Sequence, residues 1–274
     1  MKLWIGLALA GLVLLLVLAG SGWDDAAFSG DTAAAASADG PRTPVLVELF
    51  TSEGCSSCPP ADALLMHLDQ VQPVAGAEVI ALEWHVDYWN YIGWRDPFSS
   101  ADYSARQSVY AASFGADGVY TPQMVVDGRA EFVGSAEDRA RQAIARSAAA
   151  AKPVIELGLA QASPVGKLTV RIPALPNAAA NETPEIFLAL TESGLRSNVS
   201  RGENAGRRLE HGGVVRDLLL LGRATLAGSP AFATETALKL DPTWQRANLR
   251  AVVFVQERNS RRVLAAAQIP FASH

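Results

Sequence analysis

The chain contains only two cysteines, and they stand three positions apart in the segment Phe50-Thr51-Ser52-Glu53-Gly54-Cys55-Ser56-Ser57-Cys58-Pro59-Pro60. An apolar run from Val45 to Phe50 precedes them, and apolar residues at helical spacing follow from Ala61 to Val71. The pair therefore falls where a strand gives way to a helix. A helix start carries unpaired backbone N–H groups and the positive end of the dipole, which favour a thiolate. The motif predicts a redox-active dithiol, with a metal site and an inert pair as alternatives.

The N-terminus is typical of an export signal. Lys2 precedes an apolar stretch from Leu3 to Ala19, and Ala36-Ser37-Ala38 offers a small-residue cleavage pattern. Because the stretch is at the lower limit of what spans a bilayer, an uncleaved membrane anchor is the alternative. Residues 1–20 are assigned to a signal peptide or anchor, and residues 21–43, rich in Ala, Ser, Gly and Asp, to a flexible spacer. We expect an exported protein, periplasmic or extracellular.

Composition narrows the function classes. The net charge is −5 and the charged residues form no long runs, which gives nucleic acid no electrostatic footprint. Because both cysteines belong to one motif, no disulfide framework is left to staple the fold. Stability must therefore come from apolar cores, which a 49% hydrophobic content can supply.

Residues 44–151 show the element order β-α-β-α-β-β-α. After the helix that follows the cysteines, residues 79–86 read as a second buried strand and residues 100–114 as a helix. Residues 120–133 read as a hairpin that turns at Asp127-Gly128. The crossover between the first two strands predicts a parallel pair, and the hairpin adds an antiparallel edge.

Beyond Lys152-Pro153 the pattern changes to short β-rich runs. Seven such runs are separated by Pro, Gly and Asn: 154–160, 167–172, 185–191, 214–221, 234–240, 249–256 and 263–269. The run 214–221 is also compatible with a helix. Together the runs predict an all-β, sandwich-like second domain over residues 152–274.

The strand, the Cys55-Ser56-Ser57-Cys58 helix start and Thr121-Pro122 before an edge hairpin resemble the thioredoxin superfamily over roughly residues 44–150. In finer detail, the chain resembles DUF1223, a family of secreted thioredoxin-like proteins whose function is not established. The segments that carry this finer resemblance are 50–60, 85–89, 93–98, 120–126 and 201–207. The resemblance implies an α/β thioredoxin-like domain and identifies kin without identifying a reaction.

The superfamily resemblance also implies roles for single residues. Cys55 would be the more exposed, attacking cysteine and Cys58 the resolving one, while Pro122 would be cis and the Thr121 backbone would pair with a bound substrate chain. Glu48 lies near the position of a buried carboxylate that moves protons in some thioredoxins, although it is seven residues before Cys55, one more than usual. The dipeptide between the cysteines is Ser-Ser, whereas thioredoxin has Gly-Pro and its strongly oxidising relatives have Pro-His. The resemblance therefore implies no particular reduction potential.

Several polar and aromatic residues are candidates for the surroundings of the cysteines. His85 ends the second strand at the cysteine edge and is a metal ligand, a proton carrier or a histidine satisfied by local hydrogen bonds. The aromatic residues around Trp89 and Trp94 either rim a peptide-binding groove or form the loop's own small core. The polar stretch 201–208, with His211, is either a surface turn or a contact with the active edge.

We therefore expect an exported thiol-disulfide oxidoreductase that acts through Cys55 and Cys58 on protein or small-molecule thiols and disulfides, without an organic cofactor. One alternative is a copper-handling module in which Cys55, Cys58 and His85 hold Cu(I), since soft thiolates suit that ion. Another is a non-catalytic interaction protein built on a thioredoxin scaffold.

Overall fold

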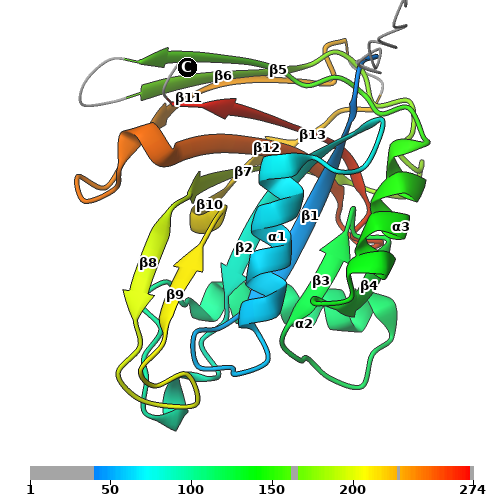
Figure 1. Ribbon diagram of the computed structural model, residues 1–274. Coiled ribbons are helices and arrows are strands. Elements are labelled where there is room, and N and C mark those ends of the chain that lie inside the picture. The colour runs from blue at the N-terminus through cyan, green and yellow to red at the C-terminus, as the bar shows by residue number, and fades with distance from the viewer. Residues whose placement is uncertain (1–39, 162–165, 227–228, 272–274) are drawn as a thin grey trace, which may run out of the picture. The chain divides into compact units, whose positions relative to one another are not determined.

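Strands from both halves of the chain form one mixed sheet of eight strands within the described residues (Figure 1). The computed structural model describes residues 40–161, 166–226 and 229–271. The signal peptide or anchor expected at residues 1–20, and all but the last residues of the spacer expected at 21–43, lie outside these ranges. Of the helices described, none is both long and apolar enough to cross a membrane.

The large sheet has the order β13-β12-β7-β10-β2-β1-β3-β4. Its strands are β1 (Thr43–Thr51), β2 (Ala77–His85), β3 (Gln123–Val126), β4 (Ala130–Val133), β7 (Pro184–Glu192), β10 (Val214–Arg223), β12 (Leu249–Glu257) and β13 (Val263–Pro270). A three-stranded sheet contains β5 (Glu156–Gln161), β6 (Gly166–Ile172) and β11 (Phe232–Leu238), and a separate hairpin contains β8 (Leu195–Asn198) and β9 (Arg208–His211). The α-helices are α1 (Pro59–Val71), α2 (Ala101–Phe114) and α3 (Glu137–Ala148), and short 3₁₀ turns cover Asn90–Ile92 and Arg246–Asn248.

The predicted strand-helix-strand unit and edge hairpin are confirmed. Strands β1 and β2 run parallel, with Thr51 opposite His85 at their carboxyl ends. Strand β3 pairs antiparallel with β1 and continues into β4 through the Asp127-Gly128 turn. The fold class is thus mixed α/β in this part of the chain, and the cysteine loop lies at the edge where β1 and β2 end.

All seven predicted β runs are strands, including 214–221, but they do not form a self-contained sandwich. Strands β7, β10, β12 and β13 instead extend the sheet of the first half, and only β5, β6 and β11 form an additional layer. The junction lies where β10 meets β2: Val214 pairs with Glu83, whose N–H donates to the Gly213 carbonyl at 2.8 Å. Gly213 has φ of 74°, and a Cβ there would lie 2.9 Å from the Ala81 carbonyl oxygen, so this approach requires glycine.

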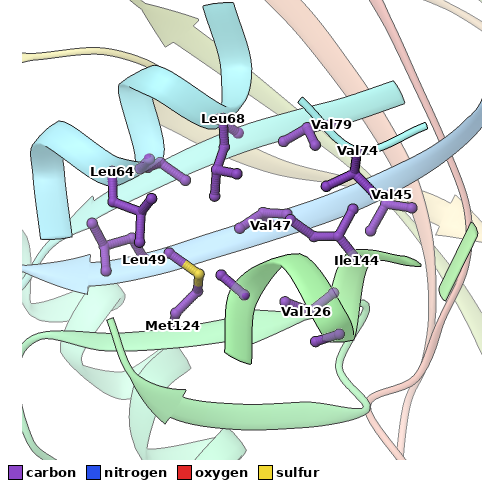
Figure 2. Packing of buried hydrophobic residues seen from close by; sticks show 14 of the residues in the cluster. Val45, Val47, Leu49, Leu64, Leu68, Val74, Val79, Met124, Val126 and Ile144 are labelled. Atoms are coloured by element: carbon purple, nitrogen blue, oxygen red, sulfur yellow. The ribbon is translucent and has the colours of Figure 1, made fainter. Parts of the chain in front are cut away.

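The two faces of the large sheet bury three apolar clusters. Alternate residues of β1 point to opposite faces, as strand geometry dictates. Val45, Val47 and Leu49 pack against α1 and α3, and Figure 2 shows Leu64 and Leu68 of α1 above them. The same face of β7, β12 and β13 is covered by the three-stranded sheet. The opposite face packs against α2 and joins both halves of the chain in one cluster that contains residues of β1, β2, β7, β10, β12 and β13.

Candidate functional site

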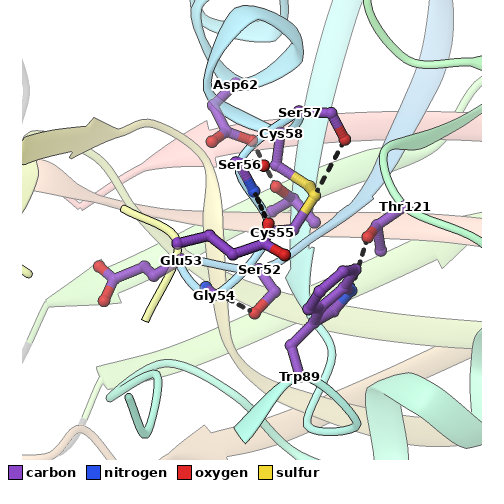
Figure 3. Close-up of a disulfide and its surroundings, with 12 residues drawn as sticks. Ser52, Glu53, Gly54, Cys55, Ser56, Ser57, Cys58, Asp62, Trp89 and Thr121 are labelled. Carbon is purple, nitrogen blue, oxygen red and sulfur yellow. Dashed lines mark hydrogen bonds between the residues drawn. A yellow bond between two sulfur atoms is a disulfide. The ribbon is translucent and has the colours of Figure 1, made fainter. Parts of the chain in front are cut away.

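The turn between β1 and α1 holds the two cysteines as a disulfide (Figure 3). Their Cα atoms are 5.4 Å apart, and Cys58 immediately precedes the first helical residue. Ser57 Oγ lies 3.4 Å from Cys55 Sγ, and because a disulfide sulfur carries no proton, the hydroxyl is the donor. The predicted position of the motif at a strand-to-helix junction is therefore confirmed.

Few backbone N–H groups at this helix start are free to face a thiolate. Pro59 and Pro60 have none. The N–H of Cys58 donates to the Cys55 carbonyl at 3.2 Å, and that of Ser56 donates to Glu203 Oε2 at 2.9 Å. The helix dipole and the Ser57 hydroxyl therefore remain as the main local groups that stabilise a negative charge on sulfur.

Residues 199–207, which connect β8 to β9, form a loop over the cysteines that we call the covering loop. Its Asn204 side chain is fully buried. The amide nitrogen donates to the carbonyls of Glu53 at 2.8 Å and Cys55 at 3.0 Å, and the amide oxygen accepts from Arg207 at 2.8 Å. The stretch 201–208 is thus a contact with the active edge, one of the two alternatives that its sequence allowed.

Both cysteines are covered. Cys55 is 1% exposed and Cys58 is 0% exposed, so the greater exposure expected for Cys55 is not found. The intervening Ser56 and Ser57 are exposed. The expectation was wrong because it considered only the strand-helix junction, whereas a hairpin from far along the chain closes over that junction. Hydrogen bonds of Asn204 and Glu203 with the backbone of Glu53, Cys55 and Ser56 hold the covering loop on the cysteine loop.

The two candidate tryptophans lie beside the cysteine loop, and both are half-buried. Trp89 donates from Nε1 to Thr121 Oγ1 at 2.8 Å, and the loop backbone approaches its Cβ closely (Figure 3). Trp94 donates from Nε1 to Glu53 Oε2 at 2.7 Å. The Thr121–Pro122 peptide bond is cis, as expected. The structure therefore places Trp89 and Thr121 beside the disulfide (Figure 3), whereas Trp94 is joined to the cysteine loop through the Glu53 side chain.

Glu48 lies elsewhere, on the sheet face that packs against α2. Its Oε1 accepts from Arg106 Nε at 2.8 Å, from a second Arg106 nitrogen at 2.6 Å and from Trp84 Nε1 at 3.1 Å. The Tyr110 hydroxyl donates to its other oxygen. Helix α1 covers the opposite face, so the structure does not gather Glu48 with the cysteines, and its four hydrogen bonds hold it within the core.

A carboxyl group that the sequence analysis did not select lies closer to the cysteines. Asp62, one helical turn after Cys58, is 3% exposed and accepts a hydrogen bond from Thr51 Oγ1 at 2.6 Å. Burial, and then the neighbouring charge of Glu83, raise its pKa to about 7, although Thr51 and two buried histidines oppose the shift. The sequence signal was the position of Asp62 three residues before Leu65, which puts it at helical spacing with an apolar residue of α1.

Behind the cysteine loop, five buried side chains form what we call the His-carboxylate cluster. His211 bonds through Nε2 to Glu53 Oε1 at 3.1 Å and through Nδ1 to Glu83 Oε1 at 2.9 Å. His85 bonds through Nδ1 to Asp96 Oδ2 at 2.7 Å, and that oxygen also accepts the N–H of Glu53 at 2.8 Å. Of these residues, only His85 and His211 were considered from the sequence, because the cluster joins four separate chain segments.

The charges in the cluster hold protons on the histidines. Burial opposes a charge on His85, but Asp96 and then Glu83 raise its pKa well above the usual value. Burial likewise opposes a charge on His211, but Glu83 and Glu53 raise its pKa to about 9. Burial alone would raise the pKa of Glu83, yet the two histidines lower it to about 2.

The ligand set suggested for Cu(I) is not gathered. Within the described ranges, one group of three His, Cys, Asp or Glu side chains has its potential ligand atoms close enough together to hold a metal ion. The group consists of Glu83, His85 and His211. It contains neither cysteine. His85 thus belongs to the His-carboxylate cluster rather than to a three-ligand set with Cys55 and Cys58.

Comparison with known proteins assigns the chain to a family. A solved structure of a structural-genomics protein from Agrobacterium tumefaciens is 24% identical, covers 86% of this chain and 97% of that one with a TM-score of 0.64, and so shares the fold. A DUF3823 family protein from Bacteroides ovatus is 14% identical over 43% of this chain and 54% of that one, and its TM-score of 0.27 is too low to indicate a shared fold. No curated protein matches the chain significantly. The model of the family described as "Protein of unknown function (DUF1223)" matches residues 46–256, and the chain therefore belongs to the DUF1223 family.

Proposed function

We propose that this protein is an exported, thioredoxin-like thiol-disulfide oxidoreductase that acts through Cys55 and Cys58 on protein or small-molecule thiols and disulfides. The observation that carries the proposal is the Cys55–Cys58 disulfide at the β1–α1 junction, with a buried carboxyl group of raised pKa one helical turn away. The export part of the proposal is supported by the apolar stretch from Leu3 to Ala19.

The reduced protein acts in two exchange steps. The Cys55 thiolate attacks one sulfur of a partner disulfide, which forms a mixed disulfide and releases the first partner thiolate. The Cys58 thiolate then attacks Cys55 Sγ, which forms the intramolecular disulfide and releases the second partner thiolate. The partner gains two electrons and the dithiol loses two, so no organic cofactor is needed. The reverse sequence oxidises a partner dithiol.

Asp62 is the group best placed to take the proton from Cys58. A thiol must lose its proton before it attacks, and an acceptor works best when its pKa lies near the ambient pH. Asp62 lies one turn after Cys58 and has a pKa raised to about 7 by burial and Glu83. The Ser57 hydroxyl, 3.4 Å from Cys55 Sγ, supplies a hydrogen bond to the attacking thiolate.

The covering loop controls access in this proposal. Two hydrogen bonds from Asn204 and one to Glu203 hold it on the cysteine loop. When a partner displaces the loop, an extended chain can bind next to Thr121, where the Trp89 indole lies, while Trp94 borders the cysteine loop through its bond to Glu53. Displacement thus exposes the sulfur and the partner-binding surface together.

The order of attack is tested by trapping. The C58S variant should accumulate mixed disulfides with a model disulfide substrate, seen by mass spectrometry, because no second thiol resolves them. The C55S variant should not trap, and the C55S/C58S double variant is the blank. Equal trapping by C55S and C58S, or trapping by neither, contradicts the assignment of Cys55 as nucleophile.

The role of Asp62 is tested through the second step. The D62N variant keeps an acceptor for the Thr51 hydroxyl but cannot take a proton, so resolution of the mixed disulfide should slow and lose its dependence on pH near 7. The matched control is D69N, because Asp69 lies on the same helix but pairs with Arg250 at 2.9 Å. A D62N rate profile that matches D69N at every pH excludes Asp62 as the proton acceptor.

A further inference from the structure

We propose that Glu83, His85 and His211 form a binding site for a divalent first-row transition metal, of which Zn²⁺ is the representative. The three side chains are fully buried, and one ligand atom from each lies within 4.8 Å of the others. The set is two imidazoles and one carboxylate, a donor combination that Zn²⁺ and related ions accept. The site is separate from the dithiol and goes beyond the proposed exchange activity.

The orientation of both imidazoles matches that of metal ligands. A histidine that binds a metal through one ring nitrogen usually donates the other ring N–H to a carboxylate or carbonyl, which fixes the tautomer. His85 is held in this way by Asp96 through Nδ1, and His211 by Glu53 through Nε2. The other two ring nitrogens both face Glu83 Oε1: Nε2 of His85 lies 3.4 Å away, and Nδ1 of His211 makes a hydrogen bond of 2.9 Å that a metal would replace.

An unsatisfied atom points into this site. His85 Nε2 is buried and makes no well-aligned hydrogen bond within the described part of the chain; Glu83 Oε1 faces it as an ion-pair partner 3.4 Å away. Buried polar atoms are almost always paired, and the explanations for an exception are strain, a catalytic role, or an unplaced water or ion. A metal bound between His85 and Glu83 gives this nitrogen its partner.

The charge of the cluster also suits a divalent cation. Glu53, Glu83 and Asp96 are three buried carboxylates, so with both histidines neutral the cluster carries a charge of −3, which a divalent ion reduces to −1. Two protons on the imidazoles give the same total. The cation therefore replaces two protons without adding to the net charge that the core must hold.

The metal would connect the covering loop to the large sheet. His211 ends β9, the strand that follows the covering loop, whereas Glu83 and His85 end β2. Figure 1 shows the β8–β9 hairpin beside the end of α1 that bears the cysteines. A bound ion thus fixes the hairpin to β2 through atoms other than the sulfurs.

The first test measures Zn²⁺ binding to the full chain with its disulfide intact, so that neither cysteine can act as a ligand. After metal removal with a chelator, competition with a chromophoric chelator at mildly alkaline pH should show one equivalent of Zn²⁺ per chain. The H211Q variant should bind at least about 10-fold more weakly, and C55S/C58S should bind as tightly as the wild type. The matched control is H67A, which removes an exposed histidine on α1 and should change nothing.

Two further measurements keep the proposal open to refutation if H211Q fails to fold. The E53Q variant retains an acceptor for His211 and should weaken binding about 10- to 100-fold. Co²⁺ in place of Zn²⁺ should give d–d absorption bands without thiolate charge-transfer bands. Absence of one tight equivalent in the wild type, equal loss in H67A, or a thiolate band in the Co²⁺ spectrum overturns the site. None of these results bears on thiol exchange, which the trapping experiment tests separately.

Discussion

Replacing Arg106 with methionine should destabilise the fold strongly, because it leaves the Glu48 carboxylate buried without its counter-charge. The side chains of Arg106 and Glu48 are 5% and 1% exposed, and two guanidinium nitrogens donate to one carboxylate oxygen at 2.8 and 2.6 Å. Breaking a buried ion pair by removing one partner typically costs about 3–5 kcal/mol. We expect R106M to lower the free energy of unfolding by about that amount.

The same residue should couple the two halves of the chain. The Arg106 guanidinium carbon lies 5.0 Å from the ring centre of Trp84 in β2, and 5.9 and 5.3 Å from those of Phe187 in β7 and Phe254 in β12. Its loss should therefore shift the unfolding of the whole described sheet as one transition, seen at the same denaturant midpoint by tryptophan fluorescence and by circular dichroism.

The matched control is R141A. Arg141 pairs with Glu137 at 2.7 Å on the surface of α3, where the side chains are 35% and 51% exposed. Such a pair contributes about 0.3–0.5 kcal/mol. The E48M/R106M double variant should be more stable than R106M, because it removes the stranded charge. The reasoning is refuted if urea unfolding places R106M within about 1 kcal/mol of R141A, or if the double variant is the less stable.

Three further outcomes are expected. G213A should lower the free energy of unfolding by more than G115A, as measured by urea unfolding of both variants. Gly115 also has positive φ, but a Cβ added there meets open space, so G115A should cost about 1 kcal/mol. The pKa of Asp62 is about 7 in the folded protein and 3.8 ordinarily, so between these pH values the folded state binds a proton that the unfolded state does not. The contribution of Asp62 to the free energy of unfolding therefore falls as the pH rises from about 4 to about 7. In D62N, this part of the pH dependence of the free energy of unfolding should be absent, as measured by urea unfolding of D62N and the wild type across the pH range. Stability curves that run parallel for the two proteins contradict this prediction. N204A should speed reduction of the disulfide by dithiothreitol about 5- to 100-fold, since two hydrogen bonds of the covering loop are lost, whereas E203Q should change the rate little; equal rates for both variants oppose loop-controlled access.

Local patterns in the sequence were sufficient for the elements and for the cysteine motif. The apolar run from Val45 to Phe50 and the helical spacing from Ala61 to Val71 place Cys55 and Cys58 at a strand-helix junction, because both signals lie within short stretches of consecutive residues. The Asp127-Gly128 hairpin is recognisable for the same reason. Strands β8 and β9 escaped notice because they are short and largely polar.

Only the tertiary structure decided which strands become neighbours and which side chains meet. The periodicity of a strand determines which face it buries but not which strand it pairs with. The local sequence therefore could not predict that β10 pairs with β2 at Val214 and joins the two halves of the chain in one sheet. The polar groups follow the same rule: His211 lies 158 positions from Glu53 yet bonds to it. Glu48, seven residues before the first cysteine, faces away from α1 because its place in the alternation of β1 assigns it to the opposite face.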